Sequence, residues 1–125
     1  MSRSPLVKAA WLAAVVFFVG SGMWAFLAPR SFFDVLATWP PYNRHLLHDV
    51  GAFSVGIGGA LLAALKWRDG LLVALAATSV GSIFHAASHV IDAGSGGKTS
   101  DPYLLGLLAL FLAAATVARA KEVTP

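Results

Sequence analysis

All four histidines of this chain fall into two short clusters, and each cluster also carries an aspartate. The clusters are His45, His48 and Asp49, and then His85, His89 and Asp92. Imidazole and carboxylate groups are the usual ligands of catalytic zinc and non-haem iron, and imidazole also binds copper and haem. Ionisable side chains of this kind are costly inside a bilayer and tend to mark function there. The residue types therefore indicate a metal or haem site, provided that the two clusters meet.

The elements that would bring them together are membrane helices. Of 125 residues, 58% are hydrophobic and only 12% are charged. Four apolar runs, at about residues 6–28, 45–65, 71–91 and 103–118, approach the ~20 residues that a spanning helix needs, and the fourth is marginal. They lack the alternation of strands, and a lipid-exposed segment must satisfy its own backbone. We expect an all-α integral membrane protein, with residues 1–125 forming a single four-helix bundle.

Basic residues predict the orientation of this bundle in the cell membrane. Six of them lie on the side shared by both termini and the second loop, and three lie on the other side. The positive-inside rule then places both termini in the cytoplasm. The first run is too long for the apolar region of a usual signal peptide, so we expect it to remain as a span. The net charge of +3 is mostly charge flanking the helices, which indicates a lipid partner and no nucleic acid.

The turn after residue 65 is short, so the second and third helices should be antiparallel neighbours with both clusters at the same outer depth. His45 and Asp49 are four residues apart and share a face, as do His85, His89 and Asp92. Small residues continue both faces inward, and membrane helices approach closely at small residues. These are Ala52, Gly56, Ala60 and Ala64 on the second helix, and Ser82, Gly81 and Thr78 on the third. We expect the two faces to meet each other or a common core.

If a metal binds, the predicted ligands are His45, Asp49, His85 and His89. His48 and Asp92 would then orient the ligating imidazoles or complete a dinuclear site. Iron, zinc and copper all tolerate this ligand set, and haem between two histidines is a further option. There is no cysteine, so thiolate ligands and disulfides are excluded. Arg44 is a candidate contact for an anionic headgroup or substrate, or a snorkelling arginine.

Two loop features complete the predicted outer end. Ser31 and Asp34 resemble a capping box, which predicts a short interfacial helix that stops before Pro40 and an aromatic belt that includes Trp39. Asp101 followed by proline reads as the N-cap of the fourth helix.

The overall plan resembles the DoxX-like group of small four-helix bacterial membrane proteins. The resemblance lies in Phe26-Leu27-Ala28-Pro29 at the end of the first helix and in the run from Asp49 to Gly58 in the second. That group is described mainly as membrane subunits or partners of redox systems, so the resemblance implies a similar role. It says nothing of the histidine clusters.

Two functions remain open from the sequence. One is a metal-dependent membrane oxidoreductase whose lipophilic substrate enters from the bilayer, with the metal at the extracytoplasmic end of the second and third helices. The other is a non-enzymatic membrane subunit or partner of a redox complex, in which the His–Asp network is structural. Either would assemble as a homo-oligomer or within a membrane complex.

Overall fold

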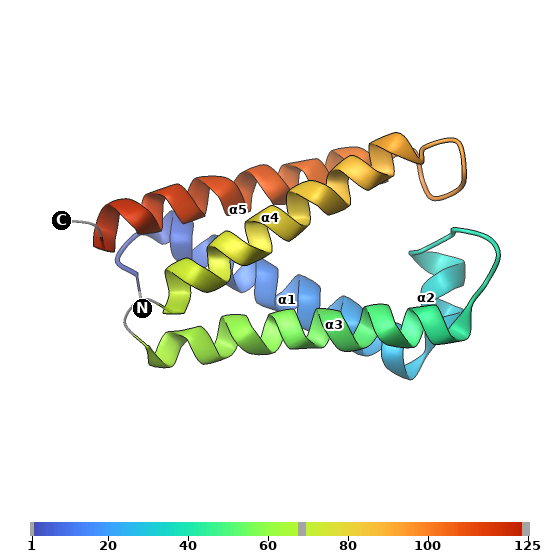
Figure 1. Cartoon of the computed structure of the whole chain (residues 1–125), viewed down its shortest axis with the longest axis horizontal. Helices are drawn as coiled ribbons and strands as arrows, with labels where there is room; N and C mark the ends of the chain where they lie inside the picture. Colours follow the sequence, from blue (N-terminus) through green and yellow to red (C-terminus); the bar gives the residue numbers. More distant parts are fainter. Residues whose placement is uncertain (1, 68–69, 124–125) are drawn as a thin grey trace.

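The computed structural model describes residues 2–67 and 70–123 and contains only helices and loops in those ranges (Figure 1). In chain order the helices are α1 (Pro5–Leu27), α2 (Pro29–Val35), α3 (Arg44–Ala63), the short 3₁₀ turn η1 (Ala64–Lys66), α4 (Gly70–Ile91) and α5 (Asp101–Val123). The predicted all-α class is confirmed. The last helix extends beyond its apolar run at both ends.

Local chemistry explains where two of the long helices begin. The Ser4 side chain accepts a hydrogen bond from the backbone N–H of Val7 at 3.4 Å, and Pro5 occupies the first turn, where its missing N–H costs nothing. Asn43 caps α3 in the same way, because its Oδ1 accepts from the N–H of Leu46 at 3.1 Å. The caps fix the register of α1 and α3, and hence the depth at which their polar side chains lie.

The four long helices are arranged as two closely packed pairs, α1 with α3 and α4 with α5. In the first pair Gly22 faces Gly51, and a β-carbon at Gly51 would lie only 2.8 Å from the carbonyl oxygen of Gly22. Glycine at both positions therefore permits the backbones to approach closely. By contrast, α3 and α4 contact each other little and diverge from their connection toward the opposite end (Figure 1).

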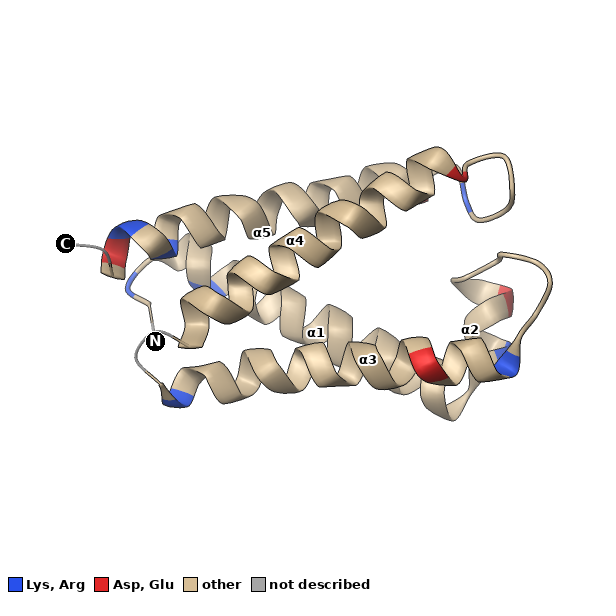
Figure 2. Cartoon of the chain, in the orientation of Figure 1, with Lys and Arg blue, Asp and Glu red and all other residues tan. Residues whose placement is uncertain are grey.

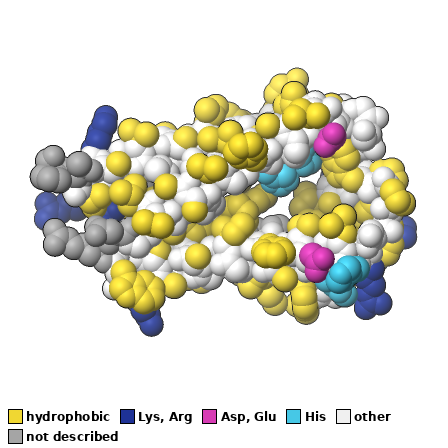
Figure 3. All heavy atoms as spheres, in the orientation of Figure 1, with side chains coloured by type: hydrophobic (Ala, Val, Ile, Leu, Met, Phe, Trp, Pro, Cys, Tyr) yellow, Lys and Arg dark blue, Asp and Glu magenta, His cyan; other side chains and the backbone are white. Residues whose placement is uncertain are grey.

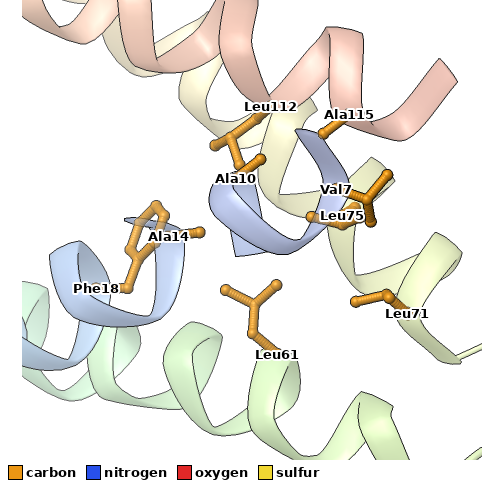
Figure 4. Close-up of a cluster of buried hydrophobic side chains, with 9 residues drawn as sticks. All are labelled: Val7, Ala10, Ala14, Phe18, Leu61, Leu71, Leu75, Leu112 and Ala115. Atoms are coloured by element: carbon orange, nitrogen blue, oxygen red, sulfur yellow. The ribbon is translucent and has the colours of Figure 1, made fainter. Parts of the chain in front are cut away.

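An apolar core joins the two pairs at the end of the molecule where the chain starts and finishes (Figure 4). Its buried members are Val7, Ala10, Ala14, Phe18, Leu61, Leu71, Leu75, Leu112 and Ala115. At the same end, the Ser2 hydroxyl donates to Glu122 at 2.6–2.8 Å and Arg119 Nη1 donates to the same carboxylate at 2.8 Å. The two ends of the described chain thus lie together, as predicted, and their placement in the cytoplasm stays a prediction.

The short helix α2 packs against α1 and α3 through a second apolar cluster, formed by Ala25, Phe32 and Leu47. The predicted capping box is wrong. The helix begins two residues before Ser31, so the Asp34 carboxylate instead pairs with Arg30 at 2.9 Å and the Ser31 hydroxyl accepts from the Trp24 indole. Since Pro29 already starts the helix, Ser31 lies inside it and cannot cap it.

The surface is that of a protein immersed in lipid. Four helices within the described ranges are long and apolar enough to cross a membrane. Large apolar side chains are exposed along them, among them Phe53, Phe84 and Leu110, which are 70–78% exposed. Hydrophobic side chains cover the face seen in Figure 3, and charged residues gather toward the two ends (Figure 2). The protein is an integral membrane protein.

Candidate functional site

The two histidines of α4 lie directly against each other. His85 and His89 are one helical turn apart, so their side chains share a face. Their Nε2 atoms are 3.2 Å apart and the ring centroids 4.9 Å apart. Both rings lie in the last two turns of α4, at the end of the bundle opposite the shared apolar core, which we call the outer end because the sequence predicts it to be extracytoplasmic. This depth agrees with the sequence-based expectation for the second cluster.

Asp101, at the start of α5, faces the second ring. Its Oδ2 lies 3.8 Å from Nδ1 of His89, and the two side chains are only 13% and 15% exposed. The same Oδ2 accepts a hydrogen bond from the backbone N–H of Lys98 at 2.8 Å. The predicted N-cap role of Asp101 is wrong, because Asp101 is already the first helical residue and the carbonyl of Ser100 accepts from Leu104. Its carboxylate is thereby directed back toward α4.

Trp39 covers the same imidazole from the other side. Its ring meets that of His89 edge-to-face, with centroids 5.2 Å apart and planes at 89°. Trp39 belongs to the segment between α2 and α3, so it comes from the other helix pair. The sequence placed Trp39 in an aromatic belt and gave no sign of this contact. His89 is the point at which α4, α5 and the α2–α3 segment meet.

The two outer loops hold Trp39 in place. The N–H of Gly97 donates to the carbonyl of Thr38 at 3.0 Å, and Lys98 Nζ donates to the carbonyl of Val35. Gly96 and Gly97 have φ of +147° and +76°, which favour glycine. Together these loops leave a shallow pocket of about 210 Å³, lined by Trp39, His85, Ser88, His89 and Asp92. Asp92 is exposed at this pocket.

The first cluster lies elsewhere. His45 Nε2 is 3.6 Å from Asp49 Oδ2, but the pair sits on the surface, with the two side chains 86% and 52% exposed. The ring of His48 packs instead against Phe26 of α1, with centroids 5.3 Å apart. In Figure 3 histidine side chains appear at two separate places, one on each side of the hollow between the helix pairs. Across residues 2–67 and 70–123, no three histidine or acidic side chains group closely enough to hold a metal ion.

The reason for this separation is the packing of α3. We expected its face bearing His45, Asp49 and Gly56 to lie against α4 or a common core. That expectation is wrong for Ala52, Gly56 and Ala60, which are exposed, and holds only for Ala64 at the far end, which is buried. The opposite face, with Gly51 and Gly58, packs on α1, and no described atom of another element lies within 4 Å of a β-carbon placed at Gly56. On α4 the expectation holds for Thr78 and Ser82, which are buried, and fails for Gly81, which is exposed.

Comparison with known protein families, curated proteins and solved structures finds no match for this chain. Of the six predicted ligand and supporting residues, His85, His89 and Asp92 line one pocket. Metal binding, by any of the ions considered or by haem, stays a prediction.

Arg44 lies in a different depression at the outer end. It lines an open pocket of about 580 Å³ together with Ala28, Pro29, Arg30, Ser31, Asp34 and Tyr42. Within it the guanidinium of Arg30 stacks over Tyr42 at 5.2 Å, and its hydrogen bond to Asp34 raises the pKa of Arg30 above its usual value. Two guanidinium groups on one open surface suit an anionic headgroup. The role of Arg44 remains as predicted and untested.

Proposed function

We propose that this protein is a non-enzymatic membrane subunit or partner of a redox complex, in which His89 and its neighbours are structural. One observation carries the structural part of this proposal: His89 of α4 contacts Asp101 of α5, in its own helix pair, and Trp39 in the α2–α3 segment of the other pair. A ring enclosed in this way is suited to holding those segments together. The resemblance to the DoxX-like proteins, many of which serve redox systems as subunits, supports the same role.

The arrangement of the helix pairs explains why such a network is needed. The pairs share an apolar core at one end, whereas α3 and α4 diverge toward the other. At that diverging end, the bridge between the pairs includes the loop hydrogen bond from Gly97 to Thr38, the contact of Lys98 with Val35, and the ring contact of Trp39 with His89. A partially buried imidazole that packs on an indole contributes both apolar contact and a polar link there.

The test compares His89→Ala with His45→Ala in purified protein that has been freed of metal by chelator. We expect His89→Ala to lower the melting temperature by several degrees, because it removes the ring that joins three segments. His45→Ala is the matched control, since its ring is exposed and should change the melting temperature little. On native gels from mild detergent, the wild-type protein should migrate as part of a larger assembly. A monomeric chain with equal melting temperatures in both variants would contradict the proposal.

A metal-dependent oxidoreductase acting on a lipophilic substrate is the second candidate. The observation in its favour is the pocket beside His85 and His89, which also contains a hydroxyl and a carboxylate, the groups needed to move protons. It lies beside the hollow between the helix pairs (Figure 3). Turnover of a lipophilic electron carrier that requires added metal and disappears in Ser88→Ala or Asp92→Asn would favour this candidate over the structural one.

A further inference from the structure

We infer that His85 and His89 form a two-nitrogen chelate for one divalent transition-metal ion at the outer end of α4, oriented by Asp101. This site differs from the one expected from the sequence, because it excludes His45 and Asp49 and adds Asp101 as a positioning residue. It stands whether the protein is a subunit or an enzyme. The ion would be one that imidazole suits, such as zinc, copper, nickel or iron.

The separation of the two imidazoles fits a shared ion. Two nitrogens bound at about 2.0–2.1 Å to a tetrahedral ion lie about 3.3–3.4 Å apart. The Nε2 atoms of His85 and His89 are 3.2 Å apart. They are four residues apart on one helix, which is the spacing that places two histidines on the same side of a metal. The side chains therefore need little rearrangement to bind.

The second nitrogen of His89 supplies an independent observation. Its Nδ1 is buried and finds no hydrogen-bond partner among the described residues. The atom faces Asp101 Oδ2 at 3.8 Å, somewhat beyond the usual length of about 2.9 Å. A metal on Nε2 requires the ring proton to be on Nδ1, and ligating histidines commonly direct that N–H at a carboxylate. Metal binding would thus fix the proton on the buried nitrogen that faces Asp101, and a small rotation of either side chain would bring the two within hydrogen-bond distance.

The surroundings complete the case for a cation. Asp92 lies on the exposed rim of the pocket that both imidazoles line, and Asp101 lies behind them, so two carboxylates border the site. The pocket has room for water or a further ligand at the remaining coordination positions. Such an open site, with two protein nitrogens, is typical of a reactive or exchangeable metal more than of a closed structural one.

Copper(II) is the probe for the first measurement, because its electron paramagnetic resonance spectrum reports how many nitrogens are bound. We expect the wild-type protein in detergent to bind one Cu²⁺ with splitting from two imidazoles. His85→Ala and His89→Ala should each lose this spectrum. The double variant His45→Ala with His48→Ala is the matched control and should keep it, because those rings lie on α3. Asp101→Asn should weaken binding about 10-fold or more by releasing the ring of His89.

Trp39 offers a second readout at the same place. Its ring is 5.2 Å from that of His89, so a bound Cu²⁺ or Ni²⁺ should quench its fluorescence. The quenching should be much reduced in Trp39→Phe, because the three tryptophans that remain in this variant make no ring contact with His85 or His89 within the described residues. If His89→Ala fails to fold, His85→Ala decides the question, since His85 is the more exposed of the two residues and its loss should disturb the fold less.

The proposal is overturned if wild-type protein binds no Cu²⁺, if His85→Ala binds it unchanged, or if the His45/His48 double variant abolishes binding. These outcomes are distinct from failure of the structural role. That role is judged by the melting temperature of metal-free protein, whereas the chelate is judged by the binding spectrum.

Discussion

Gly97 lies so close to the indole of Trp39 that a β-carbon at this position would stand 2.6 Å from Cε2 and Cζ2 of the ring. The backbone at Gly97 also has a φ of +76°, a conformation that residues other than glycine rarely adopt. The loop after α4 and the segment before α3 thus fit together only with glycine at this point. His89 depends on this fit, because Trp39 is its cover.

Gly97→Ala should therefore displace Trp39 and expose His89. We expect a loss of about 1–3 kcal/mol in stability, from backbone strain and the lost contact, measured as a lower melting temperature. Gly94→Ala is the control in the same loop, since a β-carbon there meets no described atom within 4 Å. Equal effects of the two substitutions would show that the contact of Trp39 with Gly97 is not maintained.

A second expectation concerns the α1–α3 pair. Gly51→Ala would place a methyl group 2.8 Å from the carbonyl oxygen of Gly22 and from the backbone nitrogen of Phe26, and must push the helices apart. The cost should be about 1–3 kcal/mol, as for other overpacked positions. Gly56→Ala, on the opposite face of α3, should be neutral or slightly stabilising because alanine favours helix. Thermal melting of both variants in one detergent makes the comparison.

Asp101 should matter more to stability than Asp92, although both are aspartates at the outer end. Asp101→Ala removes the acceptor of the Lys98 N–H and the carboxylate that faces His89, whereas Asp92 is exposed. We expect a loss of about 1–2 kcal/mol for Asp101→Ala and little change for Asp92→Ala. Asp101→Asn, which retains an acceptor oxygen for Lys98, should fall between them.

The orientation is open to a direct test, because the chain has no cysteine of its own. A membrane-impermeant thiol reagent added to intact cells should label Thr99→Cys, in the exposed loop before α5, and should spare Trp67→Cys. Both positions should react after the membrane is permeabilised. Labelling of the second position alone in intact cells would place the histidines in the cytoplasm and contradict the six-to-three charge argument. Arg68, one of those six charges, lies outside the described residues.

The sequence predicted the helices well because their signal is local. Each apolar run is long, and the breaks between runs contain proline or glycine, so composition alone separates the elements. The pairing of the helices was harder, because α3 has small residues on two faces. Gly56 marks one face and Gly51 the other, and the choice depends on whether Gly22 of α1 lies opposite. Nothing in α3 itself carries that information.

One part of the site was predictable from the sequence because it depends on local spacing, and the other part was not. The spacing of His85 and His89 on one helix is a local property, and the structure keeps them together. The contacts of Trp39 and Asp101 with His89 depend on two loops. The course of one is set by Gly96 and Gly97 with positive φ, and the two loops are joined by the bond from Gly97 to Thr38. A sequence reveals which residues occupy those loops and not where the loops fold back.

The two helix pairs share a core at one end only, so a small tilt of one pair there displaces its far end by a larger distance. With 22 residues, α4 is about 33 Å long. A tilt of about 5° at the shared core would move its far end by about 3 Å, as much as the whole length of the bond between Gly97 and Thr38. Changes in bilayer thickness tilt transmembrane helices by amounts of this order. The membrane itself would then act on the contact between Trp39 and His89, which joins α4 to the other helix pair at the diverging end.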